Sequence, residues 1–373
     1  MSGRYLRLAC TAAVAAAQAV LAPPLPALAA PGPERPVAEL LTDLQQAYRQ
    51  AEQATETYNA TAERLQRQRA EVTRLDGELT SARRFLHTSR TEAGRLARAQ
   101  YQNAGGLSPY VRLLLARDPQ HALDEGHVIG ELARERAKTV GRLAEDERRQ
   151  AGLARRARTA LDTQLTLAEK QKKQRDEVRT RLSDVERMLA SLTADQLTAL
   201  AGLEKDTTAA AQRKLTTSGA LSSTTPPPSP EGDRAVRYAV QQLGKPYQWG
   251  AAGPTSYDCS GLTSQAWDHA GTPIPRTSQE QWADLPHVPL NRLRPGDLVV
   301  YFPEATHVAL YLGDGKVVQA PRPGAKVKVS PIAANPILGA VRPDPTAQPL
   351  PRYTPPTIPK TAMAGPDESF GTL

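Results

Sequence analysis

The sequence predicts a compact α+β domain that follows a long, all-helical arm, and three observations support this. Positions 36–206 are rich in Ala, Leu, Arg, Glu and Gln, contain little proline, and have leucines at helical spacing. Positions 231–342 instead combine glycines, aromatic residues and short apolar runs over the length of a small domain. All three tryptophans of the 373-residue chain lie in its last third, so an ordinary hydrophobic core is expected there.

Residues 1–29 are expected to be a signal peptide. Two arginines precede an apolar, alanine-rich run, and Ala27-Leu28-Ala29 has the small-x-small pattern of a secretory cleavage site. The run is too short to span a bilayer well, and no later stretch has the roughly 18 apolar residues that a membrane helix needs. We therefore expect a protein that is secreted or associated with the cell wall, without stable membrane insertion.

Within positions 36–206, apolar residues recur in alternating steps of three and four, which is the pattern of a coiled coil. They are Val72, Leu75, Leu79, Ala82 and Leu86, and then Val178, Leu182, Val185, Leu189 and Leu192. A glycine- and proline-containing break near 103–109 lies between them, so an antiparallel helical hairpin is expected. At 1.5 Å per residue, an arm of about 65 residues is roughly 100 Å long. Its use is expected to be spacing, dimerisation or partner docking, with a solvated rod as the alternative.

Three further segments complete the organisation. Positions 207–230 gain Ser, Thr and Pro and are expected to be a flexible linker with a stiffer end. Positions 343–373 are rich in proline and are expected to be a disordered tail. The patch from Tyr110 to Leu115, near the hairpin break, is more apolar than a solvated turn requires. We expect it to pack on a partner or on the cleft of the compact domain, or else on its own hairpin.

Cys259 is the one cysteine that remains after removal of the signal peptide, so it cannot form an internal disulfide. The run Tyr257 to Leu262 opens an amphipathic helix that ends near Gly271, which places Cys259 at a helix N-terminus. There the unpaired N–H groups and the helix dipole favour an anion, so we expect a thiol pKa below its ordinary value of about 8.5. The same N–H groups suit a developing oxyanion. The alternative is a buried, inert cysteine.

A thiol nucleophile needs a base, and three histidines of the compact domain are candidates. His269 lies late on the cysteine helix and His287 lies in a predicted loop, so both are interpreted as surface residues. His307 begins a predicted strand in which alternate residues share one face.

Gln319 lies on the next predicted strand, after a turn at positions 313–315. A three-residue turn makes Gln319 the diagonal neighbour of His307, where its amide oxygen can orient the imidazole ring. A two-residue turn would place Gln319 on the wrong face, so this assignment depends on the loop.

Together these motifs resemble the NlpC/P60 family of cell-wall cysteine peptidases, over about the last third of the chain. The matching runs, in the family's order and at its spacing, are 246–250 (PYQWG), 258–262 (DCSGL), 275–278 (PRTS), 293–298 (LRPGDL) and 307–315 (HVALYLGDG). The resemblance implies a papain-like fold, with Cys259 as nucleophile and His307 as base. It places Gln319 at the third catalytic position, which is often His. A neutral amide can orient the ring but cannot stabilise an imidazolium as a carboxylate would.

The resemblance also implies a substrate. In relatives of known specificity, residues around the cysteine bind the free amino end of a wall stem peptide. By that analogy the candidate substrate-binding residues are Tyr247, Asp258, Ser260 and Ser278, with Asp258 as the charge partner. The implied reaction is hydrolysis of the bond between γ-D-glutamate and the diamino acid. The alternative for Asp258 is a purely structural helix cap.

We therefore expect a secreted cysteine endopeptidase that acts on peptidoglycan stem peptides. The formal net charge of +8 suits an anionic partner but does not select one, and no nucleic-acid partner is expected. No metal or other cofactor is implied, since the sequence has no HExxH motif and no Cys/His cluster with ligand spacing.

The arm and the domain together resemble secreted, division-associated wall hydrolases, in which a coiled coil restrains the enzyme and couples it to a membrane complex. The main alternative is a non-catalytic coiled-coil adaptor that binds wall peptide or activates another hydrolase. A second alternative is an amidase or acyltransferase on the same fold.

Overall fold

The computed structural model describes residues 36–103, 109–115, 118–222, 224–359 and 362. The expected signal peptide and the glycines of the expected hairpin break lie outside these residues. Within these ranges four helices come first: α1 (Val37–Asn103), α2 (Pro109–Leu114), α3 (Pro119–Ala190) and α4 (Ala194–Thr217). A mixed α+β domain follows, so the expected fold class is confirmed. Among the helices of the described ranges, none is long and apolar enough to cross a membrane.

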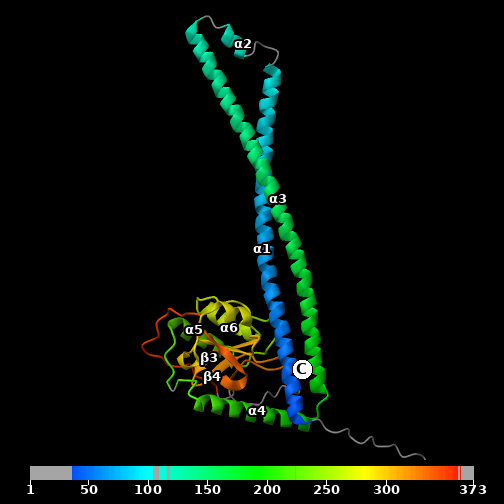
Figure 1. Cartoon of the computed structure of the whole chain (residues 1–373), viewed down its shortest axis with the longest axis vertical. Helices are drawn as coiled ribbons and strands as arrows, with labels where there is room; N and C mark the ends of the chain where they lie inside the picture. The colour runs from blue at the N-terminus through cyan, green and yellow to red at the C-terminus, as the bar shows by residue number, and fades with distance from the viewer. Residues whose placement is uncertain (1–35, 104–108, 116–117, 223, 360–361, 363–373) are drawn as a thin grey trace, which may run out of the picture. The chain divides into compact units, whose positions relative to one another are not determined.

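Helices α1 and α3 form an antiparallel pair (Figure 1). The register is set by cross-helix hydrogen bonds, in which Arg181 donates to Gln50 and Gln68 donates to the carbonyl of Ala160. The apolar positions at heptad spacing lie at the contact, and one cluster contains Leu75, Leu79, Ala82, Leu153 and Ala160. The sequence spacing therefore identifies the face of each helix that is buried.

Helix α4 differs from the flexible linker expected from position 207, because it continues to Thr217. A capping box formed by Thr193 and Gln196 starts this helix. Near its end, the Gln212 side chain donates to the Gly315 carbonyl at 3.1 Å and accepts from the Ala333 N–H at 3.1 Å. These contacts hold the end of α4 against the α+β domain. The composition of positions 207–217 alone does not indicate them.

The α+β domain is a six-stranded antiparallel sheet flanked by helices, with strand order β1-β6-β2-β3-β4-β5. The strands are β1 (His287–Val288), β2 (Leu298–Tyr301), β3 (His307–Gly313), β4 (Lys316–Gln319), β5 (Lys328–Pro331) and β6 (Ile337–Val341). The helices are α5 (Pro230–Gln241), α6 (Cys259–His269) and α7 (Ser278–Asp284), with 3-10 turns at Leu290–Arg292 and Ile332–Ala334. Helices α5 and α6 pack on each other and on β3 (Figure 1).

The sheet buries both of its faces, and the period-2 alternation of its strands determines which residues go where. In β3, Val308 and Leu310 join the core cluster shared with α5 and α6. Ala309 and Tyr311 join a second cluster, against which Leu215 of α4 packs. The alternation predicted for this strand is therefore confirmed.

The turn between β3 and β4 explains how Gln319 comes to face His307. Asp314 and Gly315 have positive φ angles of 51° and 65° and form a two-residue turn between the paired residues Gly313 and Lys316. A register shift between Tyr311 and Gly313 compensates for the short turn. Leu310 pairs with Val318, so the ladder retains the parity that a three-residue loop would have given.

The proline-rich segment after position 343 is ordered as far as it is described. Arg294 forms a buried ion pair with Asp344 at 2.9 Å, and the Leu350 N–H donates to the Pro228 carbonyl at 2.8 Å. Positions 343–359 therefore differ from the disordered tail that their composition predicts, because specific polar contacts hold them on the domain.

Candidate active site

Cys259 is the first residue of helix α6, as the sequence predicts, and its side chain is only 2% exposed. Asp258 caps the helix and accepts a hydrogen bond from the Gly261 N–H at 2.6 Å. A Cβ atom at position 261 would lie 2.2 Å from the Ala251 carbonyl oxygen, so only glycine allows this close approach. The run DCSG thus fixes the thiol at a helix N-terminus.

Asp258 has a second set of partners that the sequence analysis did not foresee. Arg276 forms a bidentate pair with it, at 3.0 Å to Oδ1 and 2.7 Å to Oδ2. The Asn59 amide of α1 donates to Oδ2 at 3.0 Å. Asp258 is completely buried, so its charge depends on these partners. The structural role considered for Asp258 is therefore real, and any substrate contact is additional to it.

His307 begins β3 and is completely buried. Among the described residues its Nε2 has a hydrogen-bond partner, whereas its Nδ1 has none and lies only at ion-pair distance from a carboxylate. Its Nε2 donates to Gln319 Oε1 at 2.7 Å, while Gln319 Nε2 donates to Ser330 Oγ at 2.8 Å. Because Gln319 donates through its nitrogen to Ser330, its oxygen is the acceptor for the imidazole. Ser330 on β5 thereby fixes the Gln319 amide, and Gln319 fixes the ring.

The other ring nitrogen, Nδ1, lies 3.3 Å from Glu52 Oε1 of α1. Glu56, one turn later on α1, has its Oε1 3.8 Å from the Cys259 sulfur. Glu56 also accepts from Ser260 Oγ at 2.8 Å and from the Ser278 backbone N–H at 2.8 Å. Helix α1 therefore contributes two carboxylates to the site.

Burial and these carboxylates determine the ionisation of the site. The pKa of the Cys259 thiol is raised well above its ordinary value by burial, with further contributions from Glu56, Asp258 and Glu52. The expected lowering of this pKa is therefore wrong for the structure described, because desolvation outweighs the helix N-terminus. Burial and repulsion by Asp258 raise the pKa of Glu56 to about 7. For His307, burial is the largest single effect and lowers the pKa, but the interactions with Glu52, Gln319 and Glu56 together outweigh it, so the net shift is upward.

The four candidate substrate-binding residues all lie near the thiol or its neighbours. Asp258 and Ser260 flank Cys259 and are completely buried. Ser278 opens α7, and it is its backbone N–H that reaches Glu56. Tyr247 is buried, and burial, followed by the charge of Cys259, raises its pKa.

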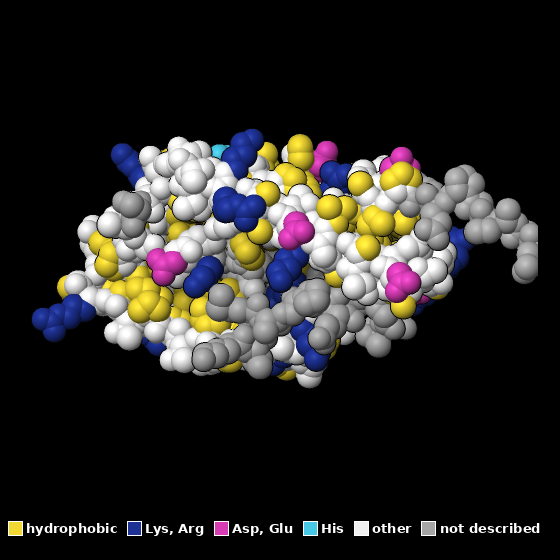
Figure 2. Space-filling model, turned by 90° about the horizontal axis from the view of Figure 1, so that it is seen from below, with side chains coloured by type: hydrophobic (Ala, Val, Ile, Leu, Met, Phe, Trp, Pro, Cys, Tyr) yellow, Lys and Arg dark blue, Asp and Glu magenta, His cyan; other side chains and the backbone are white. Residues whose placement is uncertain are grey.

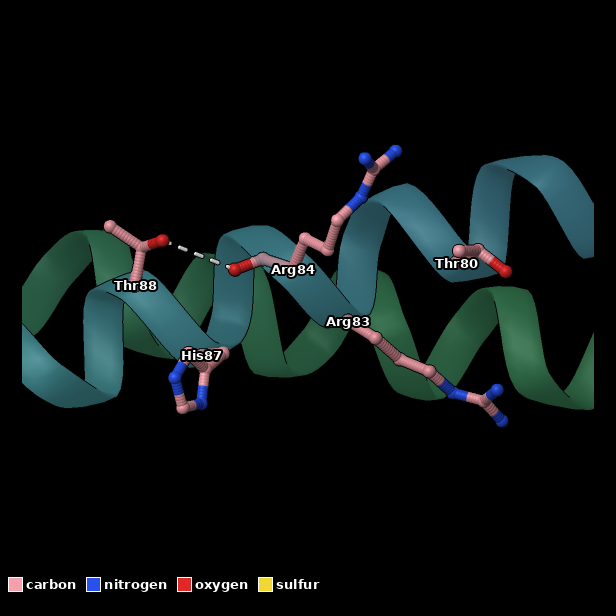
Figure 3. Close-up of a pocket in the computed structure, with 5 residues that line it drawn as sticks. All are labelled: Thr80, Arg83, Arg84, His87 and Thr88. Atoms are coloured by element: carbon pink, nitrogen blue, oxygen red, sulfur yellow. Dashed lines mark hydrogen bonds between the residues drawn. The ribbon is translucent and has the colours of Figure 1, made fainter.

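Other candidate features lie away from this site. His269 and His287 are exposed, as predicted, and the His287 ring is stacked on Trp282. His287 lies in strand β1, where it pairs with Val341, and not in the predicted loop. A hollow of about 470 Å³ on α1 is lined by Thr80, Arg83, Arg84, His87 and Thr88 (Figure 3). The two arginines there point to opposite sides of the helix, so these side chains do not converge on a ligand. On the face shown in Figure 2, Lys and Arg are dispersed among acidic and hydrophobic side chains.

Arg276, Ser330 and the α1 residues were missed by the sequence analysis for different reasons. Arg276 lies within the run PRTS, so a motif pointed to its position without giving its role. Ser330 has no local signal. Glu52, Glu56 and Asn59 lie in a helix full of charged residues, and only their shared face and burial distinguish them.

Comparison with known proteins places this domain in context. Residues 244–339 match the model of the NlpC/P60 family. A probable endopeptidase of Corynebacterium glutamicum is 41% identical over 111 residues, which are 30% of this chain and 53% of that protein. A probable endopeptidase of Mycobacterium tuberculosis is 40% identical over 114 residues, which are 30% of each chain. This chain thus spans about half or less of the length of these curated relatives.

Solved structures give similar matches. The NlpC/p60 domain of the peptidoglycan hydrolase SagA is 31% identical, with 30% of this chain and 97% of that chain covered and a TM-score of 0.28. RipD of Mycobacterium tuberculosis is 32% identical, with 30% and 96% covered and a TM-score of 0.28. RipD is described as a non-catalytic NlpC/p60 domain protein adapted to peptidoglycan binding.

Proposed function

Residues 244–339 of this chain form an NlpC/P60 family domain, and from this premise we propose that the protein is a secreted cysteine endopeptidase of peptidoglycan. The observation that carries the proposal is the pairing of two features in one site. A single thiol, Cys259, lies at the N-terminus of α6, and a histidine, His307, is oriented through Nε2 by Gln319. Thiol-based acyl transfer needs a thiol and an oriented base, and Cys259 and His307 are the residues that we propose for these two roles.

In the proposed reaction, His307 Nδ1 takes the thiol proton and the Cys259 sulfur attacks the amide carbonyl. The carbonyl oxygen becomes an oxyanion near the backbone N–H groups at the start of α6. His307 then protonates the leaving amine, and an acyl-enzyme remains as a thioester on Cys259. Water hydrolyses the thioester with His307 as the base. Gln319 is a positioning residue, since it touches the base and not the reacting atoms.

The bond that we propose is the one between γ-D-glutamate and the diamino acid of a stem peptide. Tyr247, Asp258, Ser260 and Ser278 are the proposed substrate-binding residues, because they lie beside the thiol and in the motif runs of the family. We further propose that the helical arm regulates the enzyme or docks it to a membrane complex, and that the mature protein acts at the cell wall.

A non-catalytic wall-binding role is the second candidate, and the closed contacts at Cys259 and His307 favour it for the conformation described. Product analysis separates the two candidates. The full chain is incubated with purified stem peptide, and the products are identified by mass spectrometry, with Cys259→Ala as the matched control. A fragment with a new amino terminus on the diamino acid, absent with Cys259→Ala, supports the peptidase. Fragments that persist with Cys259→Ala contradict it.

A further inference from the structure

Three polar side chains of α1 occupy the candidate active site from a single face of the helix. Glu52, Glu56 and Asn59 are spaced four and three residues apart, so they project from the same side. Their exposed fractions are only 6%, 1% and 3%. Burying carboxylates is costly unless they are paired. Their burial therefore calls for a specific partner, and each of them has one in the catalytic domain.

Glu52 engages the nitrogen of His307 that catalysis needs. Gln319 already holds Nε2, so Nδ1 is the nitrogen left to accept a proton from the thiol. Glu52 Oε1 lies 3.3 Å from Nδ1, and its charge favours the imidazolium form of the ring. An imidazolium cannot accept a proton, so this contact opposes the function of His307 as a base.

Glu56 opposes the function of the nucleophile, as Glu52 opposes that of the base. Its carboxylate is the acceptor beside the Cys259 sulfur, and its negative charge disfavours the thiolate. The same carboxylate accepts hydrogen bonds from the hydroxyl of Ser260 and the backbone N–H of Ser278. Two groups that a peptide substrate would meet are thus already occupied.

Asn59 completes the set at Asp258. Its amide donates to Oδ2, the oxygen that Arg276 also contacts. One helix face therefore supplies an N–H donor to Asp258 and a carboxylate to the thiol region. Polar groups of these kinds are what an extended peptide with an amino end would present.

Flanking contacts extend this interface along α1. Tyr58 meets Trp249 edge to face at 5.2 Å, and the Arg322 guanidinium lies over the Tyr48 ring at 5.0 Å. Glu204 of α4 holds Arg322 through two hydrogen bonds of 2.9 and 3.1 Å. Helix α4 thus fixes the residue that contacts α1 at one end of the interface.

We propose that the Tyr48–Asn59 face of α1 is an intramolecular inhibitor that occupies the active site in place of substrate. In this closed state the thiol is kept protonated, the base is engaged by Glu52, and Ser260 and Asp258 have no free position for substrate. Activation requires α1 to move away from α6 and β3. The consequence for catalysis rests on the proposed function, whereas the occlusion of Cys259 does not.

The test compares two variants of the full chain that change charge equally. Both carry Cys10→Ser, so that Cys259 is the one thiol that can be alkylated. Glu52→Arg with Glu56→Arg places two cations beside Arg276 and His307. Glu39→Arg with Asp76→Arg makes the same change at exposed positions of α1. Iodoacetamide alkylation of Cys259 measures occlusion, and stem-peptide cleavage measures activity.

Both readouts should rise about tenfold or more in the first variant and stay at the parent level in the second, because only the first loses charge-assisted contacts in the site. If circular dichroism shows that the first variant does not fold, the variant Glu56→Ala with Asn59→Ala replaces it in the test. A smaller rise in alkylation and cleavage is expected for that variant. If alkylation of Cys259 is unchanged in the first variant, or rises equally in the control variant, the proposal that α1 is an inhibitor is wrong. If alkylation becomes faster but no variant cleaves the stem peptide, the proposed occlusion by α1 stands and the proposed peptidase function is wrong.

Discussion

His307 Nδ1, in the α+β domain, lies 3.3 Å from a carboxylate oxygen of Glu52, which belongs to α1 (Val37–Asn103). Glu52 lies on α1 and His307 is the first residue of β3, so this contact joins two segments that are far apart in the sequence. The other ring nitrogen is held by Gln319, so the nitrogen that Glu52 approaches is the one left to accept a proton from the Cys259 thiol. This contact is part of the closed state that we propose for the site.

Cys259 and His307 should behave as one unit. In the Glu52→Arg/Glu56→Arg background, Cys259→Ala and His307→Ala should each remove most of the activity, on the order of 10³-fold or more. The double change should cost little more than either, because neither residue catalyses without the other. Rates of stem-peptide cleavage measure this. Losses that multiply in the double variant would mean that the residues act independently.

Gln319→Ala should be milder, lowering kcat about tenfold, because it removes one orienting hydrogen bond worth about 1.4 kcal/mol or less. Gln319→His, which can also accept from Nε2, should recover most of the rate. KM should stay the same in both variants, since Gln319 does not touch substrate. If Gln319→His is as slow as Gln319→Ala while both remain folded, an orienting role is excluded.

Inhibition of the site by α1 should be stronger at low pH. The pKa of Glu56 is raised to about 7 by burial and by Asp258, with Arg276 opposing, so the closed state binds a proton that a solvated Glu56 releases near 4.5. That stabilisation is fully present below about pH 4.5 and is lost as the pH rises through about 7. The pKa of His307 is shifted in the same direction, since burial lowers it but Glu52, Gln319 and Glu56 together raise it by more.

The measurement is the ratio of alkylation rates between the Glu52→Arg/Glu56→Arg variant and the parent at pH 5.5, 6.5 and 8. Using a ratio cancels much of the intrinsic pH dependence of the thiol. The ratio should fall as the pH rises, by up to about tenfold per pH unit for each linked proton. A ratio that is constant or increases with pH would contradict the assigned direction of the two pKa shifts.

The pair formed by Asp258 and Arg276 should contribute strongly to stability. Asp258 is completely buried, and the Arg276 side chain is only 14% exposed. Removing one partner leaves an uncompensated charge, so Asp258→Ala should lower the free energy of unfolding by about 3–5 kcal/mol. Asp258→Leu with Arg276→Met should cost less than the sum of the single changes. Denaturant titrations measure this, and additive losses would show that the pair is not coupled.

Sequence patterns predicted much of this fold for identifiable reasons. The heptad residues of α1 and α3 are buried because their period matches the helix, and the alternation in β3 matches its two buried faces. The position of Cys259 at a helix N-terminus was predicted from the amphipathic run that ends near Gly271, and Asp258 caps that helix. These are local relations between residue type and backbone geometry.

What could not be predicted depends on contacts between distant segments. The pKa of the Cys259 thiol was expected to fall, but burial raises it, with further contributions from Glu56, Asp258 and Glu52. Glu52 and Glu56 belong to α1, which is distant in the sequence. The patch at Tyr110 to Leu115 was one candidate for reaching the cleft, yet Leu114 is 83% exposed and it is Glu56 that lies there. No pattern near positions 52–59 indicates a partner in β3.

The most direct test of the account is to trap the acyl-enzyme. The Glu52→Arg/Glu56→Arg variant is mixed with stem peptide, quenched in acid after a few seconds, and examined by intact and peptide-level mass spectrometry. The account predicts a thioester on the peptide that contains Cys259, with the added mass of a fragment ending at γ-D-glutamate, and no adduct in the same variant carrying Cys259→Ala. Cleavage of the peptide with no adduct on Cys259, and at the same rate after Cys259→Ala, would contradict it.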